Sequence, residues 1–191
     1  MDPLSDITGV ILAGGKSSRF GSNKALAMVD GKPLIQHVAD LISSLFAESL
    51  LVTNTPAEYE FLSLPMTHDR YRDSGPLAGI HAALLKIRTP RAFVVACDMP
   101  NLSQELIQYI CNINGQEYDV IIPSPENGQE PLFGIYHKKS LAVIESYLQQ
   151  KDFKIISLLE DLQVRRVSEQ EILSITGNLG CFKNINRPTD L

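Results

Sequence analysis

Residues 7–15 read ITGVILAGG, seven mostly apolar residues followed by two glycines. A short uncharged run that is rich in β-branched residues and ends at glycine is typical of a strand buried on both faces. The chain then continues as KSSRFGSNK over residues 16–24, so the strand opens into a polar loop that carries cations. Such a loop is either a glycine-rich surface turn or a site that holds phosphate.

The composition limits the partners that this loop can serve. The chain has 191 residues, 44% of them hydrophobic, and a net charge of −5. This suits one domain, residues 1–191, and the mildly acidic balance argues against nucleic acid as a partner. No stretch approaches the roughly 18 apolar residues of a membrane span, and residues 1–6 lack the apolar core of a signal peptide. We therefore expect a cytoplasmic protein with a flexible N-terminus at residues 1–6 and no membrane partner.

The cysteines agree with that compartment. Cys97, Cys111 and Cys181 are odd in number and show no C-x-x-C spacing. Disulfide scaffolding and structural zinc are therefore poorly supported. We expect three free thiols that behave as small apolar side chains.

Strand and helix patterns alternate along most of the chain. Predicted strands cover residues 7–13, 49–54, 92–98, 119–125, 130–138 and 163–167, and predicted helices cover 34–45, 56–63, 75–87, 103–113, 140–150 and 154–162, with an extended piece at 181–188. This order is typical of an α/β domain with a mostly parallel central sheet and helices on both faces. The two strands around residues 119–138 predict a small antiparallel addition in the C-terminal half.

Polar residues collect where the predicted strands end. The glycine loop follows Ala13, Asn54 follows the second strand, and Asp98 ends the third. In open α/β sheets ligands bind outside the carboxyl ends of the strands. The coincidence across three strands favours a binding site over an incidental surface turn.

The loop itself has the chemistry of a phosphate site. Gly14 and Gly15 let backbone N–H groups approach an anion, and Arg19 and Lys24 add two cations. The spacing fits neither the Walker A loop nor the dinucleotide fingerprint G-x-G-x-x-G. The loop is therefore a third kind of phosphate-binding arrangement.

Six segments in order resemble one family. The loop LAGGKSSRFGSNKAL resembles the signature L-A-G-G-x-x-x-R-[MF]-G-x-[DN]-K-x-L of small nucleotidyltransferases, and most of all that of molybdenum cofactor guanylyltransferases. The segments GKPLIQHV (31–38), DSGPLAGIHAAL (73–84), CDMPNL (97–102), PLFGIY (131–136) and FKNINRPTDL (182–191) resemble the later motifs of that family. The likeness covers nearly the whole chain and implies the Rossmann-like nucleotidyltransferase fold.

The resemblance implies a reaction and its substrates. A member of this family transfers GMP from GTP to the phosphate of molybdenum-molybdopterin and releases pyrophosphate, with Mg²⁺ as cofactor. GTP and molybdenum-molybdopterin are the expected substrates, and cofactor-biosynthesis proteins are candidate partners. Related cytidylyltransferases tend to have L-A-A-G where this chain has LAGG (12–15), and the extra glycine leaves room for a purine.

The resemblance also implies roles for residues of the loop. The backbone around Leu12, Ala13, Gly14 and Gly15 would face the base and sugar, and Lys24 would contact the nucleotide. Arg19 is assigned to the catalytic group with Lys24 from its charge and position, because two cations there offset charge on the phosphates.

Acidic and amide side chains complete the expected site. Asp98 is the expected Mg²⁺ ligand and one of the expected catalytic and nucleotide-binding residues, although a carboxylate there could instead cap the following helix. Asp69 matches the nucleotide-contacting acid of the family better than Asp73 does. Asn54 is a candidate contact to the base or ribose.

Several positions carry weaker expectations. Asn184 and Asn186 could contact metal or phosphate, or belong to a plain turn, and Gln129 and Glu130 are candidates to touch the pterin. Many relatives have Asp where this chain has Asn23, so a negative charge beside Lys24 is absent.

Two other readings of the sequence remain. One is a related cytidylyl- or sugar-phosphate nucleotidyltransferase that depends on Mg²⁺, and the other is a nucleotide-binding module without catalysis. The LAGG loop argues against the first, and retention of Lys24 and Asp98 argues against the second.

Overall fold

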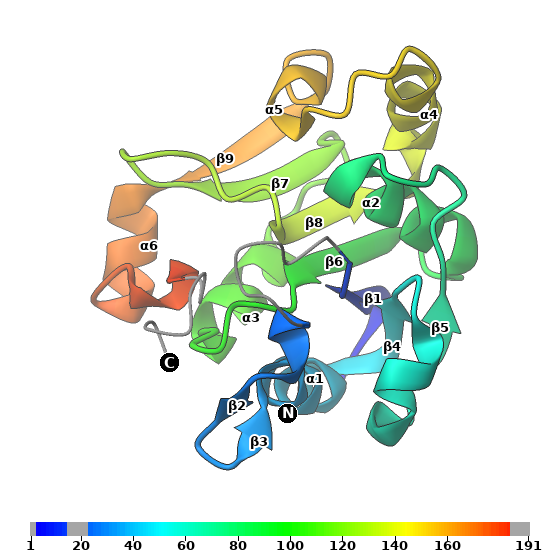
Figure 1. Cartoon of the computed structure of the whole chain (residues 1–191). Helices are drawn as coiled ribbons and strands as arrows, with labels where there is room; N and C mark the ends of the chain where they lie inside the picture. The colour runs from blue at the N-terminus through cyan, green and yellow to red at the C-terminus, as the bar shows by residue number, and fades with distance from the viewer. Residues whose placement is uncertain (1–2, 15–22, 184–191) are drawn as a thin grey trace.

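The centre of the computed structural model is a seven-stranded sheet in the order β5-β4-β1-β6-β8-β7-β9 (Figure 1). The structure describes residues 3–14 and 23–183 of the chain. The strands are β1 (Leu4–Leu12), β4 (Phe46–Val52), β5 (Met66–Thr67), β6 (Arg91–Ala96), β7 (Val120–Ser124), β8 (Phe133–His137) and β9 (Val164–Ser168). Neighbouring strands are parallel except at β8, which is antiparallel to both β6 and β7. The mostly parallel sheet and its antiparallel addition in the C-terminal half are confirmed.

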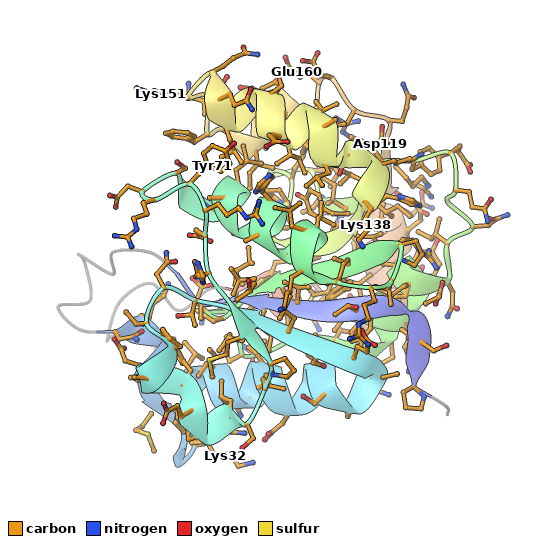
Figure 2. All side chains as sticks on the ribbon, turned by 90° about the vertical axis from the view of Figure 1, so that its right-hand side faces the viewer. Lys32, Tyr71, Asp119, Lys138, Lys151 and Glu160 are labelled. Atoms are coloured by element: carbon orange, nitrogen blue, oxygen red, sulfur yellow. The ribbon has the colours of Figure 1, made fainter. Side chains whose placement is uncertain are left out.

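Helices cover both faces of this sheet, as predicted. In the described part of the chain they are α1 (Leu34–Leu45), α2 (Gly75–Lys86), α3 (Gln104–Asn112), α4 (Leu141–Gln149), α5 (Ile155–Leu158) and α6 (Glu169–Thr176). Apolar side chains of α1, α3 and α6 share one buried cluster, and those of α2, α4 and α5 share the other. Figure 2 shows this layering, with α1 below the strands and α2 and α4 above them.

Side chains of strand β1 contribute to both buried clusters. Ile7 and Ile11 point to one cluster and Val10 and Leu12 to the other, because successive side chains of a strand point to opposite faces. Gly9 permits the close approach of α1, since a Cβ there would lie 2.5 Å from Cγ2 of Ile42. This packing fixes the position of β1, and with it the start of the glycine loop.

Several predicted boundaries differ from the structure, as at β4, which begins at Phe46 rather than at residue 49. The first strand begins at Leu4 rather than at residue 7 and so takes in the last part of the segment expected to be flexible, because Leu4 pairs with Phe46 and Asp6 forms an ion pair with Arg91. Residues 56–63 contain a 3₁₀ helix, η2 (Pro56–Leu62). An extended piece was predicted at residues 181–188, but its first two residues belong to the 3₁₀ turn η4 (Gly180–Phe182).

Helix α6 was not predicted, although its start signal is in the sequence. Ser168 and Glu171 form a capping box in which each side chain accepts a hydrogen bond from the other residue's backbone N–H. Arg165 and the Tyr109 hydroxyl also donate to the Glu171 carboxylate, so this cap joins α6 to β9 and α3. Burial raises the pKa of the Glu171 carboxyl group. The hydrogen bonds outweigh this effect and lower the pKa to about 2.

Four short elements complete the fold. The 3₁₀ turn η1 (Lys24–Leu26) follows the glycine loop, β2 (Met28–Val29) and β3 (Lys32–Pro33) pair as an antiparallel ribbon, and the 3₁₀ turn η3 (Lys138–Ser140) precedes α4. Cys97, Cys111 and Cys181 are free, as expected. In the described part of the chain no helix has the length and apolar character needed to cross a bilayer.

The order of the strands predicts where a ligand binds. From β1 the chain passes through α1 to β4 on one side, and it later passes through α2 to β6 on the other side of β1. The direction of winding therefore reverses at β1, with the two crossover helices on opposite faces. Ligands of open α/β sheets bind in the crevice at such a switch point, outside the carboxyl ends of the strands.

Candidate functional site

The end of β1 is held firmly by its two neighbours. The Ala13 N–H donates to the Val52 carbonyl at 2.9 Å, and the Cys97 N–H donates to the Leu12 carbonyl at 3.2 Å. Gly14 is exposed, and a Cβ there would meet nothing within 4 Å. The sheet therefore uses the N–H of Ala13 and the carbonyl of Leu12, and the chain is exposed from the next residue, Gly14.

Lys24 and Asp98 come together at this edge although 74 residues separate them in sequence. Lys24 Nζ lies 2.5 Å from Asp98 Oδ2, and the two side chains are 16% and 21% exposed. Lys24 stands in η1 after the glycine loop, and Asp98 follows β6. The structure thus brings two of the predicted catalytic residues into direct contact beside the switch point.

Asn54 and Asp69 form a second pair at the same edge. Asn54 donates from Nδ2 to Asp69 Oδ2 at 3.0 Å, and its Oδ1 accepts from the Asp69 N–H at 3.1 Å. Burial raises the pKa of the Asp69 carboxyl group. The hydrogen bond from the Asn54 amide and, after it, the charge of His68 act in the opposite direction but do not cancel the rise. The two residues follow β4 and β5, so their contact links the ends of the two neighbouring strands at the β5 edge of the sheet.

Asp69 and Leu12 at the end of β1 both lie against Gly79 of α2. A Cβ on Gly79 would lie 3.2 Å from a methyl of Leu12 and 3.7 Å from Asp69 Oδ1. Gly79 therefore lets the helix approach the strand end and leaves the Asp69 carboxylate beside Leu12. The sequence did not identify Gly79 as a residue of the site, although this glycine lies in the family-like segment at residues 73–84. Asp73 instead lies just before α2 with φ of +57°.

Asn23 has a definite structural role in front of Lys24. Its Oδ1 accepts from the Ala25 N–H at 3.1 Å and caps η1, while its Nδ2 donates to the Glu58 carboxylate and, at 2.8 Å, to the Tyr59 hydroxyl. Glu58 and Tyr59 belong to η2. The amide therefore fastens the segment that carries Lys24 to the connection after β4, a contact that spacing along the sequence did not reveal.

Gln129 and Glu130 lie in the turn before β8, next to the Asp98 loop. The Glu130 N–H donates to the Pro123 carbonyl at 3.0 Å, and the Leu132 carbonyl accepts from Ala96 N–H at 3.1 Å. Since β8 runs antiparallel to β6, its first residue stands at the carboxyl end of β6. The turn therefore shares the edge of the sheet on which Asp98 lies.

The remaining candidates divide into two groups. Gly15, Arg19, Asn184 and Asn186 lie outside the described residues. Cys97 is described, and burial raises the pKa of its thiol to about 12, with a further contribution from Asp98. A thiol that keeps its proton is a poor nucleophile, so Cys97 is not suited to covalent catalysis.

Within residues 3–14 and 23–183, no group of three or more His, Cys, Asp or Glu side chains is arranged to hold a metal ion. Asp98 supplies a single carboxylate, and its Oδ2 meets Lys24. Mg²⁺ commonly takes one or two protein carboxylates and completes its shell with substrate phosphates and water. The donor set at Asp98 therefore fits Mg²⁺ bound together with a nucleotide, and does not resemble an all-protein cage.

Comparisons with known proteins agree with this geometry. The family of MobA-like NTP transferase domains matches residues 9–167. The molybdenum cofactor guanylyltransferase of Desulfosudis oleivorans is 38% identical over 98% of this chain and 94% of its own length. A probable molybdenum cofactor guanylyltransferase of Carboxydothermus hydrogenoformans is 36% identical over the same shares. The crystal structure of molybdopterin-guanine dinucleotide biosynthesis protein A from Archaeoglobus fulgidus superposes with a TM-score of 0.84 at 29% identity, covering 96% of this chain and 94% of that one.

A mostly parallel sheet with a cation–carboxylate pair at its switch point, together with these similarities, defines a nucleotidyltransferase. The match extends over most of the chain and includes the end of β1 and the whole of β4, β6 and the antiparallel strand β8. The chain belongs to the family of MobA-like NTP transferase domains.

Proposed function

We propose that this chain transfers GMP from GTP to the phosphate of molybdenum-molybdopterin and releases pyrophosphate. The observation that carries the proposal is the Lys24–Asp98 contact of 2.5 Å beside the exposed Gly14. Its relatives, several of which are named molybdenum cofactor guanylyltransferases, support the choice of substrates. The free thiols also fit the reducing cytoplasm expected from the sequence.

The reaction is a direct displacement between two anions. An oxygen of the acceptor phosphate forms a bond to the α-phosphorus of GTP, and the bond from that phosphorus to the bridging oxygen breaks, so pyrophosphate leaves with the electron pair. The protein must hold the two phosphates in line and offset their charge. Lys24 is the cation for this role, and Arg19 is assigned to it from the sequence.

Asp98 is the proposed ligand of Mg²⁺. When bound, the metal neutralises charge on the phosphates of the nucleotide. Lys24 keeps the Asp98 carboxylate in place through the contact at Oδ2.

The Asn54–Asp69 pair is the proposed contact to guanine. A carboxylate accepts hydrogen bonds only, and the N1–H and 2-amino groups of guanine are donors. Asn54 occupies Oδ2 of Asp69 and leaves Oδ1 toward Leu12 and Gly79 at the end of β1. The half-buried setting strengthens such a hydrogen bond, because less water competes for the carboxylate.

The test is thermal unfolding with Mg²⁺ and each of GTP, CTP, ATP and UTP. A ligand at a hundred times its dissociation constant adds about 2.7 kcal/mol to the free energy of unfolding. We expect a selective rise with GTP, followed by formation of the guanine dinucleotide when molybdenum-molybdopterin is added. A selective rise with CTP or UTP would instead identify a related cytidylyl- or sugar-phosphate nucleotidyltransferase. GTP binding without turnover would identify a module that lacks catalysis.

A further inference from the structure

The turn before β8 carries hydrogen-bond acceptors that the described protein does not use. The carboxyl group of Glu130 is half-buried and has no hydrogen-bond or ion-pair partner among residues 3–14 and 23–183. In the same part of the chain, the buried Oε1 of the neighbouring Gln129 also lacks a donor. Burial alone raises the pKa of Glu130, since no described cation offsets its charge. A half-buried carboxylate without a donor is costly, and a ligand that donates hydrogen bonds would remove that cost.

A cavity of about 620 Å³ lies next to this turn. Its lining comes from the start of α3, the end of α6 and η4, with Asn101, Ser103, Asn178 and Cys181 among the residues. The ring of Phe133, the first residue of β8, packs edge-on against the ring of Phe182 in η4 with 5.5 Å between their centroids, so the start of β8 lies against the η4 wall of the cavity. In agreement with this packing, burial and in addition the Glu130 carboxylate raise the pKa of the Cys181 thiol. A cavity of this size is typical of small-molecule sites, and its position beside the Asp98 loop gives it access to the proposed phosphates.

The chemistry of the turn determines what it can accept. Phosphate is excluded as the direct partner of Glu130, because two anions repel and no described cation offsets the charge of this carboxylate. A neutral ring with adjacent N–H donors is the complementary ligand. The 2-amino-4-oxopyrimidine ring of a pterin presents such an edge, with an amino group beside a ring N–H.

We propose that Glu130 binds the 2-amino-4-oxopyrimidine edge of the pterin substrate, at the cavity between α3, α6 and η4. The inference rests on the proposed function, whose acceptor contains a pterin. Guanine has the same donor edge, and Asp69 is its proposed partner. Along the sheet, Asp69 follows β5 and Glu130 precedes β8, with the Lys24–Asp98 pair between them. Four strand spacings of ~4.8 Å place β5 and β8 roughly 19 Å apart, so two separate rings fit on either side of the phosphates.

Titration of two fluorescent probes tests this inference. The probes are 6-hydroxymethylpterin and 6-hydroxymethyllumazine, which has an oxo group in place of the 2-amino group. We expect the wild-type protein to prefer the pterin by about tenfold or more, as for a hydrogen bond to a charged group. Glu130→Gln keeps the shape, replaces one acceptor oxygen by a donor, and should abolish the preference by weakening pterin binding about tenfold.

Glu126→Gln is the matched control. Glu126 is an exposed acid in the same connection between β7 and β8, and only its backbone N–H makes a described hydrogen bond, to Glu169. This variant should keep the wild-type preference. Pterin preference that survives in Glu130→Gln, or a wild-type protein that binds neither probe or both equally, overturns the inference.

Thermal unfolding with GTP separates this result from the proposed function. Glu130→Gln should retain the rise caused by GTP and Mg²⁺, because Glu130 lies away from the nucleotide. A wild-type protein that binds the pterin selectively without any GTP response would contradict the proposed function and leave the role of Glu130 supported. A normal GTP response without pterin binding would overturn the inference alone.

Discussion

The side-chain amide of Asn23 donates a hydrogen bond to the carboxylate of Glu58, and this contact connects η1 to η2. An Asp side chain could still accept from the Ala25 N–H and cap η1, but it could not donate to Glu58. The choice of Asn is therefore matched to an acid 35 residues further along the chain.

Asn23→Asp should lower the free energy of unfolding at neutral pH by about 1 kcal/mol, because it places two carboxylates in contact near the surface. Urea unfolding measures the loss. The double variant Asn23→Asp with Glu58→Gln should recover most of it, since the amide introduced by the second substitution can donate in the reverse direction. An Asn23→Asp protein as stable as the wild type would show that the contact contributes nothing.

The two members of the Lys24–Asp98 pair should fail in different ways. Asp98→Asn should lower turnover about a hundredfold or more and make the GTP-induced rise in melting temperature independent of Mg²⁺. Lys24→Met should reduce that rise both with and without Mg²⁺, because it removes a cation from the phosphates. Thermal unfolding over a range of Mg²⁺ concentrations, with a turnover assay, distinguishes the two.

A second lysine–aspartate pair provides the control for these variants. Lys32 Nζ on β3 of the ribbon lies 3.1 Å from Asp40 Oδ2 on α1. Both side chains are exposed and lie away from the switch point. Lys32→Met and Asp40→Asn should leave both readouts near the wild-type values. Equal effects from the two pairs would mean that general charge, rather than position, produces the response.

Asp69→Asn should alter the choice between purine bases. The wild-type protein should bind GTP about tenfold or more tightly than ITP, which lacks the 2-amino group, because a hydrogen bond to a carboxylate is lost. Asp69→Asn should remove most of that difference, as measured by competition in a thermal-shift titration. Asp73→Asn is the control, because it changes a nearby carboxylate just before α2 at a left-handed position that Asn tolerates. This variant should keep the wild-type preference for GTP over ITP. GTP preference that survives in Asp69→Asn would assign guanine recognition elsewhere.

His81 should make the protein less stable in mild acid. It is 1% exposed on α2, neither ring nitrogen has a hydrogen-bond partner among the described residues, and its ring packs edge-on to Tyr71. Burial lowers its pKa, an effect that the Glu145 carboxylate opposes and Arg70 increases. The unfolded state therefore binds a proton more readily, so stability falls as the pH drops below about 6.5 toward the lower pKa of the folded state.

His81→Leu should remove this part of the pH dependence. The variant should be at least as stable as the wild type at pH 8, because an apolar side chain replaces two unsatisfied polar atoms, and its advantage should grow at pH 5. Urea unfolding at the two pH values measures the change. Figure 2 shows Tyr71 beside α2, so the Tyr71–His81 contact is the packing to preserve in any alternative substitution. Parallel pH profiles for the two proteins would contradict the assignment.

Much of the fold could be predicted from local patterns. The run ITGVILA predicted a central strand because a strand buried on both faces needs continuous apolar residues, and the stripe after Pro33 predicted α1 from Leu34 to Leu45. The capping box of α6 was overlooked although Ser168 and Glu171 have the required spacing. The start of β1 and the 3₁₀ geometry of η2 depend on neighbouring segments, so local propensity alone did not determine them.

The sequence by itself determined the chemistry at the switch point. The glycine loop with Lys24, Asn54 and Asp98 were expected at the ends of predicted strands, and parallel strands end at one edge of a sheet. Asp69 was assigned from the family resemblance, because β5 before it was not predicted. Only the tertiary structure decided which of these side chains touch. Lys24 meets Asp98 across 74 residues, Asn54 holds Asp69 rather than Asp73, and Asn23 faces Glu58. Contacts between distant residues depend on strand order and helix packing, and a single sequence carries no local signal for either.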